Sequence, residues 1–169
     1  MEANEKPELV IRPEIPTDHE AVHALTAAAF DREDEATLVD ALRQDTGWID
    51  GLSWVAELDG RIVGHALATR CHIGKTPALC LAPCSVAPDL QGEGVGSLCI
   101  DAVIAAAQRQ GEKFMTVLGH PNYYPRFGFL VDPRVTLPFE VDEGAFMVLK
   151  LAQDSMPAGE VKYADAFGI

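Results

Sequence analysis

Hydrophobic and polar residues alternate along the chain in patterns that predict both strands and helices. An apolar run at 9–12 predicts a first strand, which the prolines that follow end. Thr17 and Glu20 have the spacing of a capping box, so we expect a helix to begin at Asp18. A second amphipathic helix is expected over about 35–44.

The middle of the chain predicts a β-hairpin, followed by a strand that runs into a helix. Asp59 and Gly60 can supply the positive φ angle that a tight turn needs, so they should connect strands at 53–58 and 61–71. A longer apolar run predicts one further strand at 78–86. The remaining expected elements are a helix at 94–110 and strands at 114–118, 130–136, 145–151 and 160–164.

The order of these elements defines the expected fold class. A strand, two helices, several strands, a strand–helix–strand unit and closing strands are typical of an α/β protein with a mixed sheet and helices on both faces. The chain of 169 residues shows no internal repeat, low-complexity run or linker. We therefore expect one domain that spans residues 1–169.

The composition excludes several classes of partner. Hydrophobic residues make up 48% and charged residues 23%, as in ordinary globular proteins rather than disordered ones. The 13 basic and 26 acidic residues give a net charge of -13, which repels nucleic acid and anionic membranes. Such a surface suits cationic substrates, amines among them.

The chain also lacks the marks of export, membrane insertion and metal binding. Residues 1–8 are polar and acidic where a secretory signal needs basic residues and an apolar run, and the apolar helical stretch at 98–107 is too short to span a bilayer. We therefore expect a cytoplasmic protein. The four cysteines match neither a zinc nor a redox spacing, so we expect reduced thiols and no metal. They are Cys71, Cys80, Cys84 and Cys99.

The most informative segment is a glycine-rich turn, 91–97, between an apolar strand and a long helix. The first N–H groups of a helix have no partner within it, and glycines let a ligand approach them, so this turn can cradle a phosphate without a lysine. A plain tight turn is the alternative. A dinucleotide fingerprint would need glycine where Ser97 stands, and the Gly-Lys-Ser/Thr of a Walker loop is absent.

Two blocks of this sequence resemble a known family. Gln91-Gly92-Glu93-Gly94-Val95-Gly96 is similar to the Q/R-x-x-G-x-G/A acyl-CoA motif of the GNAT superfamily of N-acetyltransferases, and Tyr124-Pro125-Arg126-Phe127-Gly128-Phe129 is similar to its Y-x-x-x-G-F segment. The resemblance covers about 9–151, with 152–169 as a C-terminal strand extension. The residues around 119–124 and 160–167 resemble an uncharacterised bacterial subgroup.

The resemblance implies a mixed, mostly antiparallel sheet with a V-shaped split between the strand before the glycine turn and the strand at 114–118. It also implies that acetyl-coenzyme A (acetyl-CoA) lies in this split and on the glycine turn, held mainly by backbone. Gln91 stands where arginine is common, which removes one charge contact, and Pro125 allows only a short helix after Asn122. The implied cofactor-binding residues are Cys84, Ser85, Val86, Gln91, Gly92, Glu93, Gly94, Val95, Gly96, Ser97 and Asn122.

The chemistry needs a neutral amine, a stabilised oxyanion and a protonated leaving thiolate. The resemblance places the acid at Tyr124 rather than at Tyr123. A tyrosine hydroxyl has an ordinary pKa of about 10 against roughly 8.5 for a thiol, so it is protonated at neutral pH and carries a proton that the departing thiolate can take up. Backbone N–H groups near Val86 suit the oxyanion. The base is left open between His120 and, through a water, Glu57.

Two further side chains are expected to stay outside the reaction. His65 is interpreted as a structural residue of the sheet. Cys84 offers a nucleophile for a two-step transfer, but direct transfer needs none.

The sequence thus predicts an acetyl-CoA-dependent N-acetyltransferase that acts on a primary amine. Loops at 30–35 and 70–76 are expected to shape the acceptor pocket. A non-catalytic acyl-CoA-binding module is the alternative, and Ser97 argues against a nucleotide-dependent oxidoreductase. Members of the superfamily often dimerise, and the terminal strands are the expected contacts of a homodimer.

Overall fold

The computed structural model describes residues 8–169, so the polar opening segment that the sequence shows lies, apart from Glu8, outside the described residues. Nine strands form the sheet, in which β1, β2, β3, β4, β6 and β8 follow one another, while β5 and β9 pair with β3 and β7 pairs with β9. The strands are β1 (Leu9–Pro13), β2 (Ser53–Leu58), β3 (Arg61–Ile73), β4 (Thr76–Leu81), β5 (Ser85–Val86), β6 (Phe114–Leu118), β7 (Val135–Thr136), β8 (Phe146–Lys150) and β9 (Gly159–Lys162).

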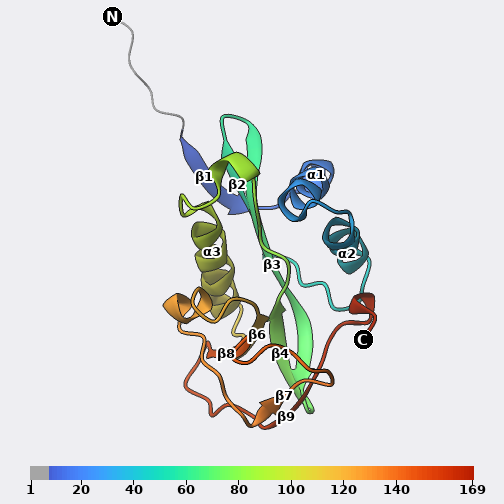
Figure 1. Ribbon diagram of the computed structural model, residues 1–169, viewed down its shortest axis with the longest axis vertical. Helices are drawn as coiled ribbons and strands as arrows, with labels where there is room; N and C mark the ends of the chain where they lie inside the picture. The colour runs from blue at the N-terminus through green and yellow to red at the C-terminus, as the bar shows by residue number, and fades with distance from the viewer. Residues whose placement is uncertain (1–7) are drawn as a thin grey trace, which may run out of the picture.

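Helices cover both faces of this sheet, as the sequence predicts. Figure 1 shows α1 (His19–Phe30) and α2 (Asp34–Arg43) on one side of β3, and α3 (Val95–Arg109) on the other. The pairs are antiparallel except for β4 with β6 and β7 with β9. The mixed, mostly antiparallel sheet that we expected is therefore confirmed.

The two faces of β3 are built from different residues. Leu67 packs with Val22 and Leu42 on the side of α1 and α2. Small residues face α3, and a Cβ atom on Gly64 would lie 2.7 Å from Cγ1 of Val95. The small side chains therefore let α3 approach the sheet closely, which fixes the position of its N-terminus.

The prediction of a single strand at 78–86 is wrong, because the structure has two strands there, β4 and β5. Ala68 of β3 pairs with Leu81, whereas His65 pairs with Ser85, so four steps along one strand oppose three along the other. Such an extra residue is a β-bulge, which re-aims the strand. Pro83 lies within it and has no N–H to give to a ladder.

Several predicted boundaries also need correction. The α1 helix begins at His19 rather than at Asp18, and its N-cap has no side-chain hydrogen bond, because the Asp18 carboxylate instead accepts from Arg12 and from Ile15 N. The strand predicted at 130–136 shrinks to β7, since a turn precedes it in which Val135 N donates to Asp132 O. The strand predicted at 160–164 is β9.

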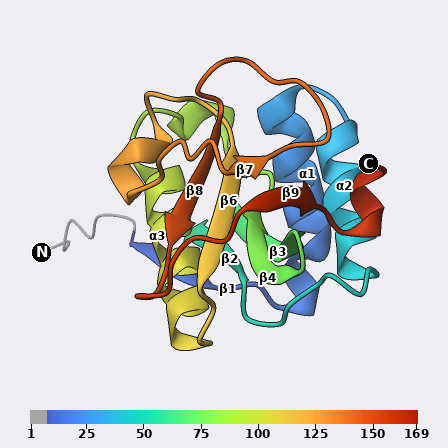
Figure 2. The same ribbon diagram turned by 90° about the horizontal axis from the view of Figure 1, so that it is seen from below.

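The C-terminal segment crosses from β8 to the side of the sheet on which α2 lies (Figure 2). In Figure 2, β9 crosses towards α2, beside which the C-terminus lies. The pairs His72 with Lys162 and Ile73 with Val161 join β9 to the end of β3. No helix of the described residues is long and apolar enough to cross a membrane.

Candidate active site

A split in the sheet lies at the ends of the parallel strands β4 and β6. The two strands pair only at Leu79 with Met115 and at Cys80 with Thr116. Beyond that point β5 pairs with β3, whereas β6 continues along β8 as far as Leu118. The bulge between β4 and β5 thus opens the V-shaped split that the sequence resemblance implies.

Backbone groups of Val86 face this split. Ala87 N donates to Val63 O at 2.9 Å, and Val86 is the next residue of that antiparallel ladder, opposite Gly64. Hydrogen-bonded pairs alternate with non-bonded pairs in such a ladder, so the N–H and C=O of Val86 point away from β3. The carbonyl accepts from Nε2 of Gln91 at 3.3 Å, which leaves the N–H directed at the open side.

The glycine turn forms a cradle at the start of α3. Gly92 and Gly94 have φ angles of +82° and +86°, and a Cβ on either would meet nothing within 4 Å. The first bond of the helix runs from Leu98 N to Gly94 O, so the N–H groups of 95–97 precede it and have no partner within the helix. These glycines are therefore needed for the backbone conformation of the turn, not for close packing, and they leave the space around it open.

The cradle is a hollow of about 190 Å³ that collects most of the predicted cofactor residues. Three lining residues, Leu90, Tyr123 and Arg126, are not among the predicted ones. The Tyr123 hydroxyl lies 2.8 Å from Oγ of Ser97, and the Arg126 guanidinium lies over the Tyr123 ring, 4.3 Å from its centroid. Arg126 thus brings to the cradle a positive charge that Gln91 cannot supply. The predicted residues that line it are Val86, Gln91, Gly92, Gly94, Val95, Gly96 and Ser97.

A second cavity, of about 460 Å³, adjoins the cradle, and Tyr123 lines both. The predicted residues Cys84, His120 and Tyr124 line this larger cavity. Of the loops expected to shape an acceptor pocket, 30–35 contributes Phe30 and Glu35, whereas 70–76 contributes nothing. Residues 70–76 lie instead around the end of β3, whose edge pairs with β9.

Tyr124 is held firmly between neighbours. Its ring meets that of Phe129 edge to face at 5.9 Å, and a Cβ on Gly119 would lie only 2.3 Å from its Cε2 atom. Burial, followed by the proximity of Cys84, raises the pKa of the Tyr124 hydroxyl. The hydroxyl therefore stays protonated at neutral pH.

The Cys84 thiol, by contrast, is in surroundings that disfavour its reactive, ionised form. Burial raises its pKa to about 12, and Sγ donates to Ala82 O at 3.4 Å. Only the thiolate is a good nucleophile, so this cysteine is poorly suited to carry an acyl group.

The candidate bases lie in different surroundings. His120 is exposed and borders both the 460 Å³ cavity and a shallower hollow of about 690 Å³. Glu57 lies outside both hollows and accepts from Nε of Arg12 at 2.8 Å. The geometry therefore brings His120, but not Glu57, to the split.

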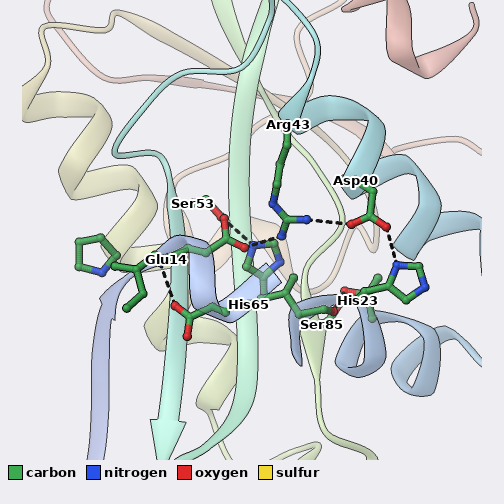
Figure 3. Close-up of polar contacts among 12 residues, drawn as sticks. Glu14, His23, Asp40, Arg43, Ser53, His65 and Ser85 are labelled. Atoms are coloured by element: carbon green, nitrogen blue, oxygen red, sulfur yellow. Dashed lines mark hydrogen bonds and ion pairs between the residues drawn. The ribbon is translucent and has the colours of Figure 1, made fainter. Parts of the chain in front are cut away.

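His65 is fully buried beneath the two N-terminal helices. Figure 3 shows it beside Ser53, whose Oγ lies 2.8 Å from Nε2. Burial, followed by the charge of Arg43, lowers the pKa of His65 to about 3, so the ring is neutral. Its Nδ1 has no partner among the described residues. His65 lines neither hollow at the split, in keeping with its interpretation as a structural residue.

Three predicted cofactor residues line neither the cradle nor the larger cavity. Ser85 is buried, its Oγ donates to Oγ1 of Thr26 at 3.3 Å, and its backbone pairs with His65 of β3, so both its side chain and its backbone are turned away from the split. Glu93 and Asn122 are exposed beside the hollows.

The chain matches the Acetyltransferase (GNAT) family over residues 19–129. It is 33% identical to the uncharacterized N-acetyltransferase YjhQ of Escherichia coli K12, with 88% of each chain covered. It is 29% identical to the uncharacterized N-acetyltransferase YhbS of the same strain, covering 94% of this chain and 98% of that one.

Two solved structures have the same fold. One is the GNAT family N-acetyltransferase YhbS from E. coli in complex with CoA, with a TM-score of 0.91, 26% identity and 100% and 97% coverage. The other is a GNAT family acetyltransferase from Brucella melitensis in complex with acetyl-CoA, with a TM-score of 0.81, 34% identity and 95% and 98% coverage. Sequence, split sheet and glycine cradle agree: this chain belongs to the GNAT family of acetyltransferases.

Proposed function

We propose that this protein binds acetyl-CoA and transfers its acetyl group directly to a primary amine. The observation that carries the proposal is the junction of the cradle and the larger cavity at Tyr123, inside the split. The place for an anionic group thereby adjoins a cavity that is lined by a protonated tyrosine, Tyr124, and an exposed histidine, His120. Relatives with this fold bind CoA and acetyl-CoA.

The residues of the cradle fit the phosphates of the cofactor. The N–H groups of 95–97 and the positive end of the α3 dipole favour an anion, and Arg126 adds a full positive charge. The lack of side chains at Gly92 and Gly94 leaves this backbone accessible. The pantetheine arm would lie along Val86, whose N–H faces the split.

The reaction follows from these positions. Acetyl-CoA, when bound, supplies the acetyl group as a thioester. The Val86 N–H is directed to stabilise negative charge on the carbonyl oxygen, and His120 accepts the proton that the amine loses and passes it to water. Tyr124 Oη donates its proton to the sulfur as the carbon–sulfur bond breaks and the carbon–nitrogen bond forms, and regains one from solvent.

Release of free CoA thiol tests this function. The purified protein with acetyl-CoA and a panel of primary amines should release thiol in proportion to the amide formed. Binding of acetyl-CoA with no turnover on any amine would instead identify a non-catalytic module. The Tyr124→Phe variant keeps the ring and removes the proton, so we expect kcat to fall about 10²-fold with the KM for acetyl-CoA nearly unchanged.

The whole of 1–169 is proposed to act as one acetyltransferase domain in the cytoplasm. The C-terminal extension supports the proposal of one domain, because Tyr163 and Phe167 line the same cavity as Tyr124. The four cysteines are free, in keeping with a reducing compartment.

A further inference from the structure

Part of the lining of the 460 Å³ cavity consists of aromatic and aliphatic side chains from three separate parts of the chain. Phe30 and Leu38 come from α1 and α2, Phe139 from the segment between β7 and β8, and Tyr163 and Phe167 from the C-terminal extension. None of these side chains lines the cofactor cradle. We call these five residues the apolar wall.

The apolar wall is already ordered by contacts within the protein. The Tyr163 ring stacks on that of Phe139 with 6.3 Å between centroids and an angle of 25°, and it lies 5.3 Å from the ring of Phe167. Asp45 holds the end of the chain: its Oδ2 accepts from Ala166 N at 2.9 Å and its Oδ1 from Gly47 N at 2.7 Å. A ligand that enters this cavity therefore meets a preformed surface.

Charge is scarce inside the cavity. Glu35 is the acidic residue among those that line it, and its side chain is 14% exposed and paired with Arg32. This pair lowers the pKa of Glu35, so the carboxylate is ionised and its charge is already compensated. A polyamine that entered would bury several ammonium groups without free partners, which is costly.

The hollow that adjoins this cavity is different, because acidic residues line it, and we call it the acidic mouth. Glu140, Asp142 and Glu143 line the hollow of about 690 Å³, which shares Gly119 and His120 with the 460 Å³ cavity. An ammonium group is attracted to such a mouth, whereas an apolar body is favoured by the wall. His120 lies where the two surfaces meet.

We propose that the acceptor is a small monoamine with an aromatic or branched aliphatic body, which the apolar wall binds while the amine points to His120. This inference rests on the proposed function and names the acceptor class of that same site. Binding of the amine brings one positive charge past the acidic mouth. Deprotonation at His120 then yields the neutral nucleophile.

The test compares acceptors at saturating acetyl-CoA. We expect kcat/KM for 2-phenylethylamine to exceed that for ethylamine or spermidine by about 30-fold or more, since a phenyl ring buries on the order of 100 Å² of apolar surface. Raised salt should increase the KM for the amine, because the acidic mouth is screened. Equal or better turnover of spermidine would overturn the proposal while leaving the acetyltransferase function intact.

Variants of the wall provide the second arm. Phe139→Ala and Phe167→Ala should each lower kcat/KM for 2-phenylethylamine about 10-fold, with little change for ethylamine or in the KM for acetyl-CoA. Phe167→Leu should recover much of the loss. Ile15→Ala truncates an apolar side chain that is 50% exposed and lines neither hollow, so it serves as the matched control.

The remaining outcomes separate this inference from its rivals. If both Phe variants slow all amines alike, the wall supports the fold and does not select the acceptor. If they abolish a preference for longer acyl-CoA thioesters instead, the cavity holds the acyl chain, and the proposal is wrong. Failure of every amine, with acetyl-CoA bound or not, would count against the proposed function itself.

Discussion

Replacement of Gly119 by alanine should disable the site by moving one aromatic ring. A Cβ at this position would lie 2.3 Å from Cε2 and 3.0 Å from Cδ2 of Tyr124. Ordinary contact begins at 3.4 Å, so the ring has to retreat by about 1 Å. Because a misplacement of that size can cost about 10²-fold in rate, we expect kcat to fall on the order of 10²-fold.

The assay is thiol release at saturating amine and acetyl-CoA, with the KM for acetyl-CoA measured in parallel. That KM should hardly change, because Gly119 does not line the cradle. Gly60→Ala is a control for the loss of a glycine far from the site, since a Cβ there meets nothing within 4 Å and only the φ of +77° is strained. It should lower stability slightly and leave kcat unchanged.

The double variant Gly119→Ala/Tyr124→Phe separates displacement of the ring from general damage. If both changes act through the Tyr124 hydroxyl, the double variant should be about as slow as the slower single variant. Losses that multiply would refute the reasoning, and so would a Gly119→Ala enzyme of normal speed.

Three other predictions concern the cradle and the N-terminal helices. Arg126→Ala should raise the KM for acetyl-CoA, measured by thiol release, about 10-fold at low salt, because a positive charge beside the phosphates is lost. The increase should be smaller at high salt, which screens this charge in the wild type. Gly94→Ala should cost about 1 kcal/mol in urea unfolding, since its φ of +86° disfavours a side chain. The third concerns His23, whose ring nitrogens lie 2.8 Å from Oε2 of Glu33 and 2.6 Å from Oδ2 of Asp40, which raises its pKa. This contribution to stability is complete below the unfolded pKa of about 6.5 and is lost as pH rises through the folded pKa, so urea midpoints should fall between about pH 6 and pH 8 in the wild type but not in His23→Gln. Parallel pH profiles of the two proteins would contradict this.

Local patterns predicted the elements whose causes are local. The turn at Asp59 and Gly60 and the helix after the glycines depend on residues within a few positions of each other, and both form as expected. Motif spacing likewise indicated Tyr124, which lies at the split. Its catalytic role stays a prediction.

What the sequence concealed depends on contacts between distant residues. An unbroken apolar run hid the bulge before Ser85, because the register of a strand is fixed by its partner, and Pro83 was the available signal. The apolar wall combines residues as distant in sequence as Phe30 and Phe167, and the C-terminal end is held in place by the bond from Ala166 N to Asp45. No local pattern reveals either contact. Arg126 lies inside the recognised second block, but its approach to the cradle required the fold.

Calorimetric titration of the protein with acetyl-CoA tests the central claim most directly, namely that unpaired amides at the start of α3 bind the cofactor. We expect one molecule to bind per chain. Binding should be weaker in Gly96→Ala, where a Cβ would press on Val86 at 3.1 Å and narrow the cradle. Absence of binding heat in the wild type at several temperatures would contradict the account.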